Sequence, residues 1–215
     1  MKDFNAKSRE AYNEKAHDYD NTPEGRFTRK FKDILHENVI VKDNDSVLDV
    51  ACGNGTFLAE ISKKKHITGY GVDIAEEMIK VSSRKYPSLI FKVSGCEKIP
   101  FDDGIMDIIT VCAAYHHFPD VDSFAKEAER LLKPNGTLYI AEVYYPAFFR
   151  MIFNPFIPLS KAGDVKFYSP KEIIKTFTKR KFISDGVIKS EHIQLVKLRR
   201  SQTKKIWRKL FYEKT

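Results

Sequence analysis

Two glycines follow a short apolar run at a point where the chain changes from strand to helix. Residues 47–56 read VLDVACGNGT, an apolar strand interrupted by Gly53 and Gly55. Glycine allows left-handed backbone conformations and close approach to a ligand, and the helix that follows presents free N–H groups. Ligands of open α/β sheets bind at this end of the strands. The run is therefore predicted to bind a nucleotide-like ligand.

The spacing of these glycines does not fit the dinucleotide-binding pattern G-x-G-x-x-G. Read from Gly53, the pattern needs a third glycine where Leu58 stands, and read from Ala51 it ends at Thr56. Asp73 ends the next apolar run, where a carboxylate can accept hydrogen bonds from both ribose hydroxyls. Asp73 can also cap the following helix, and the two roles are compatible. A nicotinamide-dependent oxidoreductase is disfavoured but stays open.

Two adjacent histidines, His116 and His117, follow the fourth expected strand. Imidazole titrates near neutral pH, so either is a candidate general base if the acceptor must lose a proton. One packed and one exposed histidine is the structural alternative. No further ligands cluster with them in the sequence, so we expect no metal site.

Strands and helices alternate along the chain at the lengths typical of βαβ units. Such alternation builds a parallel sheet with helices on both faces. The expected strands are residues 46–50, 68–74, 88–93, 106–112, 137–143, 182–189 and 192–198, the last two as a closing pair. The expected helices are residues 7–20, 23–38, 56–65, 76–86 and 121–132, and one that begins at Ser169-Pro170.

Most of the net charge of +8 lies at the carboxyl end. Residues 199–215 hold seven basic residues and one acid, which is +6 of the +8. A solvated terminal helix explains this tail most simply, and contact with nucleic acid or anionic lipid is the alternative. The apolar stretch 143–159 is too short and too rich in proline to span a membrane. We expect it to be an aromatic-rich loop or broken helix that packs as a lid or lines an apolar acceptor.

Composition agrees with an ordinary globular chain. The 215 residues suffice for one domain, and 42% are hydrophobic and 31% charged. The three cysteines, Cys52, Cys96 and Cys112, lack CxxC spacing, and no secretory signal is expected. The simplest expectation is that the three cysteines are reduced thiols and that the protein is cytoplasmic.

Five motifs follow one another in order over roughly residues 12–143. They are Asp49-x-Ala-Cys-Gly-x-Gly, Gly71-Val-Asp73-Ile, Ile99-Pro-Phe-x-Asp103, Tyr115-His-His-Phe-Pro-Asp120 and Leu131-Leu-Lys-Pro-Asn-Gly-Thr-Leu-Tyr-Ile140. Together they resemble the class I S-adenosylmethionine-dependent methyltransferases, in the ubiquinone/menaquinone-biosynthesis-like (methyltransferase type 11) branch. The resemblance implies a Rossmann-like, doubly wound, mostly parallel seven-stranded sheet with helices on both faces and a C-terminal antiparallel strand pair.

The resemblance also implies which residues hold the methyl donor, S-adenosylmethionine. Asp49 would orient its ammonium group, directly or through water, and Asp73 would bind the ribose. The turn that wraps its methionine part would consist of Ala51, Cys52, Gly53, Asn54 and Gly55. The adenine ring would contact Ile74, Met78 and the backbone N–H of Cys96. The carbonyl near Cys112, with Ala113, would face the methionine end, and the carboxylate side would be covered by Tyr19 and Tyr12.

Two positions depart from the family pattern. Ala51 stands where the family often has glycine, which a tight turn tolerates in many variants. Gly95 stands where the family usually has an aspartate that binds the adenine amino group. In this chain that contact must come from the backbone, from water or from Glu97.

The expected activity is in-line transfer of a methyl group to a small-molecule acceptor. We expect one domain over residues 1–215, with helices in 1–40 covering the cofactor and a lid or substrate segment at 144–168. The expected acceptor contacts are Tyr115, His116 and Tyr144. The alternatives are an RNA methyltransferase that uses the basic tail, an NAD-dependent oxidoreductase and a nucleotide-binding protein without turnover.

Overall fold

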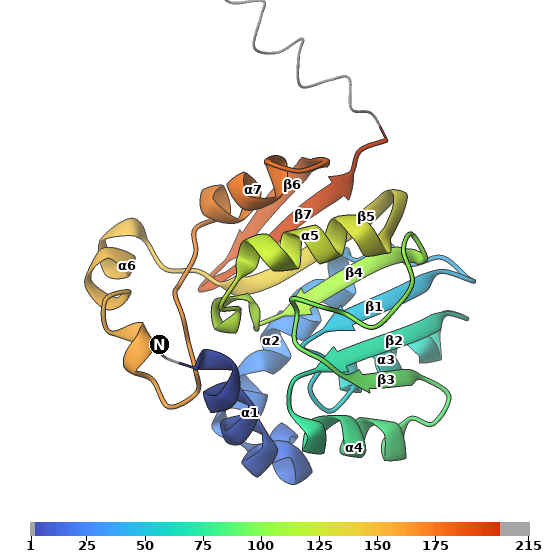
Figure 1. Cartoon of the computed structure of the whole chain (residues 1–215), viewed down its shortest axis with the longest axis horizontal. Coiled ribbons are helices and arrows are strands. Elements are labelled where there is room, and N and C mark those ends of the chain that lie inside the picture. Colours follow the sequence, from blue (N-terminus) through green and yellow to red (C-terminus); the bar gives the residue numbers. More distant parts are fainter. Residues whose placement is uncertain (1–2, 203–215) are drawn as a thin grey trace, which may run out of the picture.

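The computed structural model describes residues 3–202, and they form one seven-stranded sheet in the order β3-β2-β1-β4-β5-β7-β6 (Figure 1). The strands are β1 (Ser46–Val50), β2 (Thr68–Asp73), β3 (Ile90–Val93), β4 (Met106–Cys112), β5 (Leu132–Val143), β6 (Phe182–Ser190) and β7 (Ile193–Arg200). The first five strands pair in parallel, and β7 runs antiparallel to both β5 and β6. The predicted doubly wound sheet with an antiparallel closing pair is confirmed.

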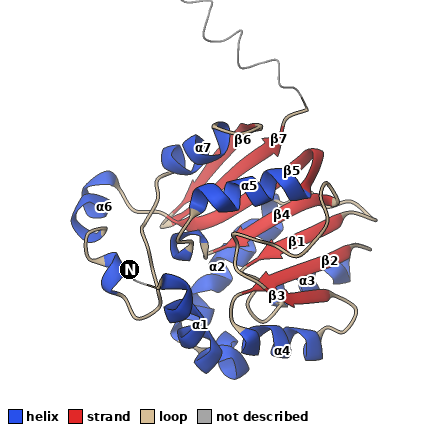
Figure 2. Ribbon diagram, in the orientation of Figure 1, coloured by secondary structure: helices blue, strands red, loops and turns tan. Residues whose placement is uncertain are grey.

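Helices pack on both faces of this sheet (Figure 2). They are α1 (Phe4–Lys15), η1 (Ala16–Asn21), α2 (Pro23–Asn38), α3 (Thr56–Lys64), α4 (Glu76–Lys85), η2 (Tyr115–His117), α5 (Val121–Leu131), α6 (Ala147–Phe153), η3 (Ile157–Leu159) and α7 (Pro170–Thr178). One buried cluster joins the sheet to α5 and α7 through Phe124 and Phe177. The other joins it to α2 and α3 through Phe31 and Phe57. Both faces therefore bury apolar side chains, which explains why most residues of β1 and β4 are apolar.

The first helix is shorter than its apolar spacing predicts. It ends at Lys15 and continues as the 3₁₀ segment η1, because Asp18 leaves helical geometry at φ −128° and ψ 24°. Thr22 then caps α2 by accepting a hydrogen bond from the N–H of Gly25, with Pro23 at the first helical position. A side chain at Gly25 would lie 1.8 Å from the carbonyl oxygen of Tyr19. The lack of a Cβ there lets η1 fold tightly against the start of α2.

Two other boundaries differ from the sequence expectation. The strand expected at 137–143 instead begins at Leu132, because Leu132 already pairs with Met106 while Thr137 pairs with Ile108. The tail also begins later than expected, since Arg199 and Arg200 belong to β7. Arg199 pairs with Asp185 at 3.0 Å. The rest of the predicted basic tail, residues 203–215, lies outside the described residues.

The apolar stretch after β5 folds as the broken helix that its prolines predict, with α6 followed by η3. Between residues 3 and 202, no helix has the length and apolar character needed to cross a bilayer. Figure 1 shows α6 standing away from the sheet, on the side to which the arrowheads of the parallel strands point. The helix α1 lies on the same side, so both border the carboxyl ends of the strands.

Candidate active site

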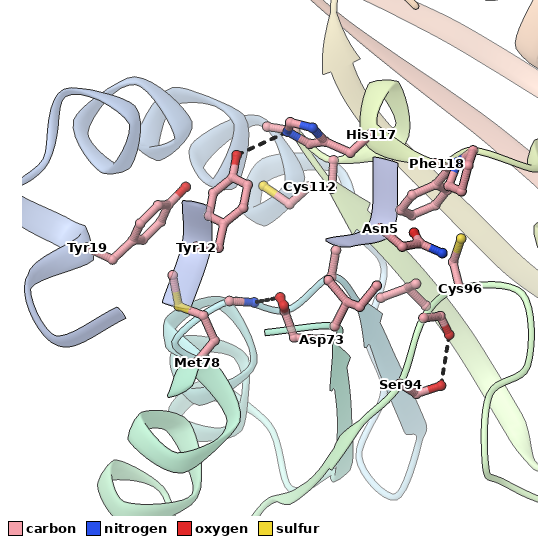
Figure 3. A pocket seen from close by; sticks show the side chains of 18 residues that line it. Asn5, Tyr12, Tyr19, Asp73, Met78, Ser94, Cys96, Cys112, His117 and Phe118 are labelled. Atoms are coloured by element: carbon pink, nitrogen blue, oxygen red, sulfur yellow. Dashed lines mark hydrogen bonds between the residues drawn. The ribbon is translucent and has the colours of Figure 1, made fainter. Parts of the chain in front are cut away.

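A pocket lies at the carboxyl ends of β1, β2 and β4, beneath α1 and η1 (Figure 3). It encloses about 690 Å³, including space open to solvent. Eleven of the residues singled out from the sequence line it: Tyr12, Tyr19, Ala51, Gly53, Asp73, Ile74, Met78, Cys96, Cys112, Ala113 and His117. These residues come from five separate segments of the chain, and the sheet brings them to one edge.

The glycine turn forms the floor of the pocket. Ala51, Gly53 and Gly55 have positive φ angles of 59°, 53° and 76°. No atom lies within 4 Å of the Cβ position at Gly53, so the backbone is bare on that side. At Gly55 the same position lies 2.8 Å from the ring of Phe91, because the turn packs closely on its neighbours. Glycine is thus required at 55 by packing, whereas at 53 it leaves room beside the backbone.

Asp73 holds this turn in place. One carboxylate oxygen accepts the N–H of Gly53 at 2.8 Å and the other accepts the N–H of Ala75 at 2.9 Å. The side chain is largely buried, and burial raises its pKa while the two backbone hydrogen bonds oppose the rise. Each oxygen keeps a lone pair, so the carboxylate is able to accept further hydrogen bonds from a ligand.

Asp49 lies behind the turn and does not line the pocket. It is 2% exposed, and its carboxylate accepts a hydrogen bond of 2.6 Å from the hydroxyl of Thr110. Burial raises the pKa of Asp49 to about 7, against the opposing effect of that hydrogen bond. A cation bound near the turn would favour the ionised carboxylate.

Tyr12 and Tyr19 close the pocket from the amino-terminal side. Their rings lie 6.1 Å apart, and the hydroxyl of Tyr12 lies 3.0 Å from Nε2 of His117. Burial raises the pKa of both phenols, that of Tyr19 to about 12. The pair therefore stays neutral at physiological pH and ties α1 to the turn after β4.

Gly95 leaves a gap that Glu97 fills. A Cβ built on Gly95 would lie only 2.6 Å from Oε2 of Glu97. The carboxylate thus stands beside the space that the side chain of an aspartate at 95 would take. Ser94 fixes the surrounding loop by donating to the carbonyl of Lys98 at 2.8 Å.

The two histidines have different surroundings, and both are largely enclosed. Nδ1 of His116 lies 2.8 Å from Oε1 of the buried Glu142, and its Nε2 lies 3.4 Å from Asp164. Burial alone would lower the pKa of His116, but Glu142 and Asp164 outweigh it and raise the pKa. Burial and the neighbouring charge of His116 keep the pKa of His117 well below its usual value. The expected pair of one packed and one exposed histidine is therefore wrong.

All three predicted acceptor contacts lie outside the pocket lining. Tyr115 is fully buried among the rings of Phe118, Phe124 and Tyr168, because η2 turns it into the core. His116 is turned toward Glu142. Tyr144 lies beyond the end of β5, where its N–H donates to the carbonyl of His192.

Besides Asp49, four predicted cofactor residues also lie outside the lining. Asn54 instead accepts hydrogen bonds from the N–H and hydroxyl of Thr56, at the start of α3. The Cβ position of Gly71 would lie 2.8 Å from the sulfur of Cys52, which is buried behind the turn. The other two are Gly55 and Glu97, already described.

Several lining residues were assigned no ligand contact from the sequence, and most directly follow or precede predicted ones. They are Asn5, Val50, Ser94, Gly95, Ala114, Phe118 and Pro119. A search of the immediate neighbours of each motif would have found all but Asn5. Asn5 reaches the pocket only because α1 folds across it.

The comparisons with known proteins agree with this geometry. A family model described as a methyltransferase domain matches residues 48–140. Residues 48–140 are thus similar to a methyltransferase domain. A demethylmenaquinone methyltransferase from Chlorobaculum tepidum is 35% identical over 100 residues, which are 46% of this chain and 41% of the relative. The ubiquinone/menaquinone biosynthesis C-methyltransferase UbiE of Rickettsia felis is 31% identical over 132 residues, 54% of this chain and 53% of the relative.

The chain thus spans about half the length of the curated relatives that it matches. Among solved structures, the geranyl diphosphate C-methyltransferase of Streptomyces coelicolor aligns with a TM-score of 0.76 at 11% identity, over 93% of this chain and 99% of that one. The [4+2]-cyclase SpnF aligns with a TM-score of 0.70 at 12% identity, over 80% and 81%. At these identities the likeness shows the fold of the methyltransferase domain and not its substrate.

Proposed function

We propose that this chain transfers the methyl group of S-adenosylmethionine to a small, largely apolar acceptor. The observation that carries the proposal is the coupling of Asp73 to the glycine turn at the carboxyl ends of β1 and β2. The buried carboxylate of Asp73 lies there beside the left-handed backbone of Gly53, which has no side chain. Such an arrangement is expected for a site that binds the ribose and amino-acid parts of one ligand. The sulfonium group of that ligand would supply the activated methyl group.

The protein's own part is to bind, orient and exclude water. Asp73 would accept the ribose hydroxyls, while the turn at Gly53 would approach the amino-acid end. Tyr12 and Tyr19 would cover this end from α1 and η1. Asp49, behind the turn, would favour a bound ammonium group through its charge. Such positioning for in-line displacement supplies a large part of the rate enhancement.

The acceptor side of the pocket is apolar. The segment after β4 contributes Ala114, Phe118 and Pro119 to the lining, and His117 adds its imidazole. An apolar wall with few polar groups favours a small molecule over a nucleic-acid backbone. Most of the basic tail, the basis of the RNA-methyltransferase alternative, lies outside the described residues. We also infer a cytoplasmic location, which accords with three free cysteines.

Titration calorimetry with S-adenosylhomocysteine tests the donor assignment. Asp73→Ala should weaken binding by about 10- to 100-fold, as expected for charge-assisted hydrogen bonds of roughly 1.5–3 kcal/mol. Asp107→Ala is the matched control, since Asp107 also accepts a backbone N–H, from Ser46, at the opposite end of the sheet. Equal affinity in wild type and Asp73→Ala, or binding of NAD in place of S-adenosylhomocysteine, would overturn the assignment.

We further propose that Glu97 receives the adenine amino group in place of the family's aspartate. The position of its carboxylate beside Gly95 supports this role. Glu97→Ala should lower affinity for S-adenosylhomocysteine several-fold and should leave affinity for its inosine analogue, which lacks the amino group, unchanged. A Lys98→Ala variant controls for disturbance of the loop. If Glu97→Ala weakened both ligands equally, the contact would lie elsewhere.

A further inference from the structure

Three donor atoms converge where η2 meets the segment after η3. They belong to His116, His117 and Asp164, and one ligand atom of each residue lies within 4.8 Å of the other two. Nε2 of His116, Nδ1 of His117 and Oδ1 of Asp164 are the atoms that approach one another. Oδ1 of Asp164 lies 3.4 Å from the first nitrogen and 3.0 Å from the second. The third ligand comes from 47 residues further along the chain than His117, which is why the sequence alone did not suggest a cluster.

Nδ1 of His117 is buried but has no hydrogen-bond partner. Although Asp164 is close enough, the two groups do not meet with hydrogen-bond geometry. An unpaired nitrogen in a protein interior is costly, and each such atom in a folded protein needs an explanation. A bound cation would provide one, because its three ligands need to point at a common centre and not at each other.

The outer nitrogen of each histidine is already held by a second residue. Nδ1 of His116 lies 2.8 Å from Glu142, which also accepts the N–H groups of His116 and Val143. Nε2 of His117 lies 3.0 Å from the hydroxyl of Tyr12. If each outer nitrogen donates its proton, the lone pairs of Nε2 of His116 and Nδ1 of His117 face the centre. A carboxylate behind a histidine ligand is typical of zinc sites.

We propose that His116, His117 and Asp164 bind one divalent zinc ion. Zinc binds nitrogen and oxygen ligands at about 2.0–2.1 Å in tetrahedral geometry, which separates the ligands by about 3.3 Å. The distances of 3.0 and 3.4 Å to Asp164 match this spacing. Two imidazoles also select zinc over magnesium, which prefers oxygen ligands.

Three protein ligands leave the fourth position open. His117 lines the pocket, so the ion would lie behind the pocket wall at this residue. A zinc ion there would bind an anionic oxygen of the acceptor and orient it toward the methyl group. This role rests on the proposed function, whereas binding of the ion does not.

Zinc titration of the full-length chain, after dialysis against a chelator, tests the site. Calorimetry should give one ion per chain at micromolar or tighter affinity, with little heat from magnesium. Asp164→Asn and His117→Ala should each weaken zinc binding at least about tenfold, as loss of one of three ligands does. Circular dichroism would show that both variants fold. His36→Ala is the matched control, because Nε2 of His36 faces a single carboxylate, Glu60, at 2.6 Å.

Absence of stoichiometric zinc binding, or equal loss in His36→Ala, would overturn the site. So would unchanged affinity in both ligand variants. The result is independent of the donor assignment, because S-adenosylhomocysteine binding is measured separately and does not require the ion.

A second inference comes from the surface of α6 and η3. Seven large apolar side chains are exposed within twelve residues: Phe148 63%, Phe149 47%, Met151 70%, Ile152 41%, Phe153 48%, Phe156 63% and Leu159 65%. We call these seven residues the α6 patch. Contiguous apolar surface of this kind marks a binding face, because an isolated soluble chain gains nothing from it.

The charges within the chain segment that carries the α6 patch have one sign, although Glu172 lines a groove together with Arg150 and Met151. Between Glu142 and Asp164 the chain holds no acidic residue, and it holds Arg150 and Lys161. Exposed aromatic and aliphatic side chains flanked by basic residues are typical of segments that lie in the interface of an anionic bilayer. The short α6, with seven residues, would insert at the headgroups without crossing.

We infer that the α6 patch docks on an anionic lipid surface. Co-sedimentation with vesicles of phosphatidylglycerol and phosphatidylcholine should show binding that vesicles of phosphatidylcholine alone, or high salt, greatly reduce. Met151→Ser with Phe156→Ser should lower partitioning about tenfold or more, since both side chains are exposed and bury area only on binding. Ile40→Ser with Ile90→Ser is the matched control, exposed by 64% and 41% elsewhere.

Equal partitioning of the patch variant and the control variant would overturn this inference. Light scattering distinguishes the other occupant of an apolar face, a second copy of the chain. A dimer that the patch variant abolishes, in a chain that does not bind vesicles, would make the α6 patch a dimer interface instead.

Discussion

The donor side and the acceptor side of the pocket are built in different ways. On the donor side, strand ends fix the backbone, and the buried Asp73 clamps the turn at Gly53. Segment 144–168, which we propose to flank the acceptor side although it does not line the pocket, is held by contacts between residues far apart in the chain, such as the hydrogen bond from Ser8 to the carbonyl of Ala162. The first arrangement depends on the sheet and the second on side chains. Substitutions on the acceptor side are therefore expected to leave the donor site intact.

The largest expected effect comes from Gly55, on the donor side. In Gly55→Ala the new Cβ would lie 2.8 Å from Phe91 and 2.9 Å from Ser82, at a φ of +76°. The left-handed conformation costs roughly 1–2 kcal/mol, and overpacking adds about 1–3 kcal/mol. Urea unfolding should show the sum as lost stability, and S-adenosylhomocysteine binding should fall with it. Gly53→Ala is the control, since it carries the conformational strain without the clash.

Because of Asp49, both the stability of the fold and the binding of the donor should depend on pH. Its pKa of about 7 in the folded, ligand-free chain is higher than the unfolded value, so the folded state binds the extra proton. This group therefore favours folding at acid pH, and its contribution falls as pH rises from about 4 to about 7. A ligand that places its ammonium group near the turn lowers the pKa of Asp49, so binding should tighten severalfold between about pH 6 and pH 8.

Titration of S-adenosylhomocysteine across this range, in buffers of different ionisation heat, measures the proton released on binding. Asp49→Asn should abolish both the release and the pH dependence. Because Asp73 and the histidines also titrate near the pocket, an unchanged pH profile in Asp49→Asn would assign the effect to them.

A substitution at Gly163 provides the corresponding test for segment 144–168. Its φ is +75°, and a Cβ would lie 2.6 Å from the carbonyl oxygen of Phe4 and 2.6 Å from the hydroxyl of Ser8. Gly163→Ala should separate this segment from α1 and cost about 1–3 kcal/mol. Affinity for S-adenosylhomocysteine should fall less than in Gly55→Ala, because the glycine turn is untouched. An equal loss of affinity in Gly55→Ala and Gly163→Ala would show that the donor site depends on segment 144–168 as much as on the glycine turn.

The same distinction explains what the sequence could predict. Strand ends, glycines and Asp73 are local features whose spacing fixes where they meet, so the sheet and the donor floor were predictable. Asn5 reaches the pocket, and Asp164 reaches the histidine pair, only through tertiary contacts, and no periodicity marks them. Tyr115 was misplaced because an aromatic residue after a strand fits the core as well as a pocket, and only the direction of η2 decides between them. Gly95 was noticed as a departure, but the position of Glu97 beside it needed the folded loop.

The smallest expected effect concerns the α6 patch. Met151 is 70% exposed, so Met151→Ser should change the free energy of unfolding by no more than about 0.5 kcal/mol. The buried counterpart is Phe57, which is 1% exposed on α3, and Phe57→Ala should cost about 3–5 kcal/mol. Urea unfolding of both variants, without lipid, measures the contrast. A loss above about 1 kcal/mol in Met151→Ser would mean that the patch is covered in solution by the chain itself or by a second copy. A neutral result means that these apolar side chains do not contribute to folding, which leaves binding as the physical reason for their exposure.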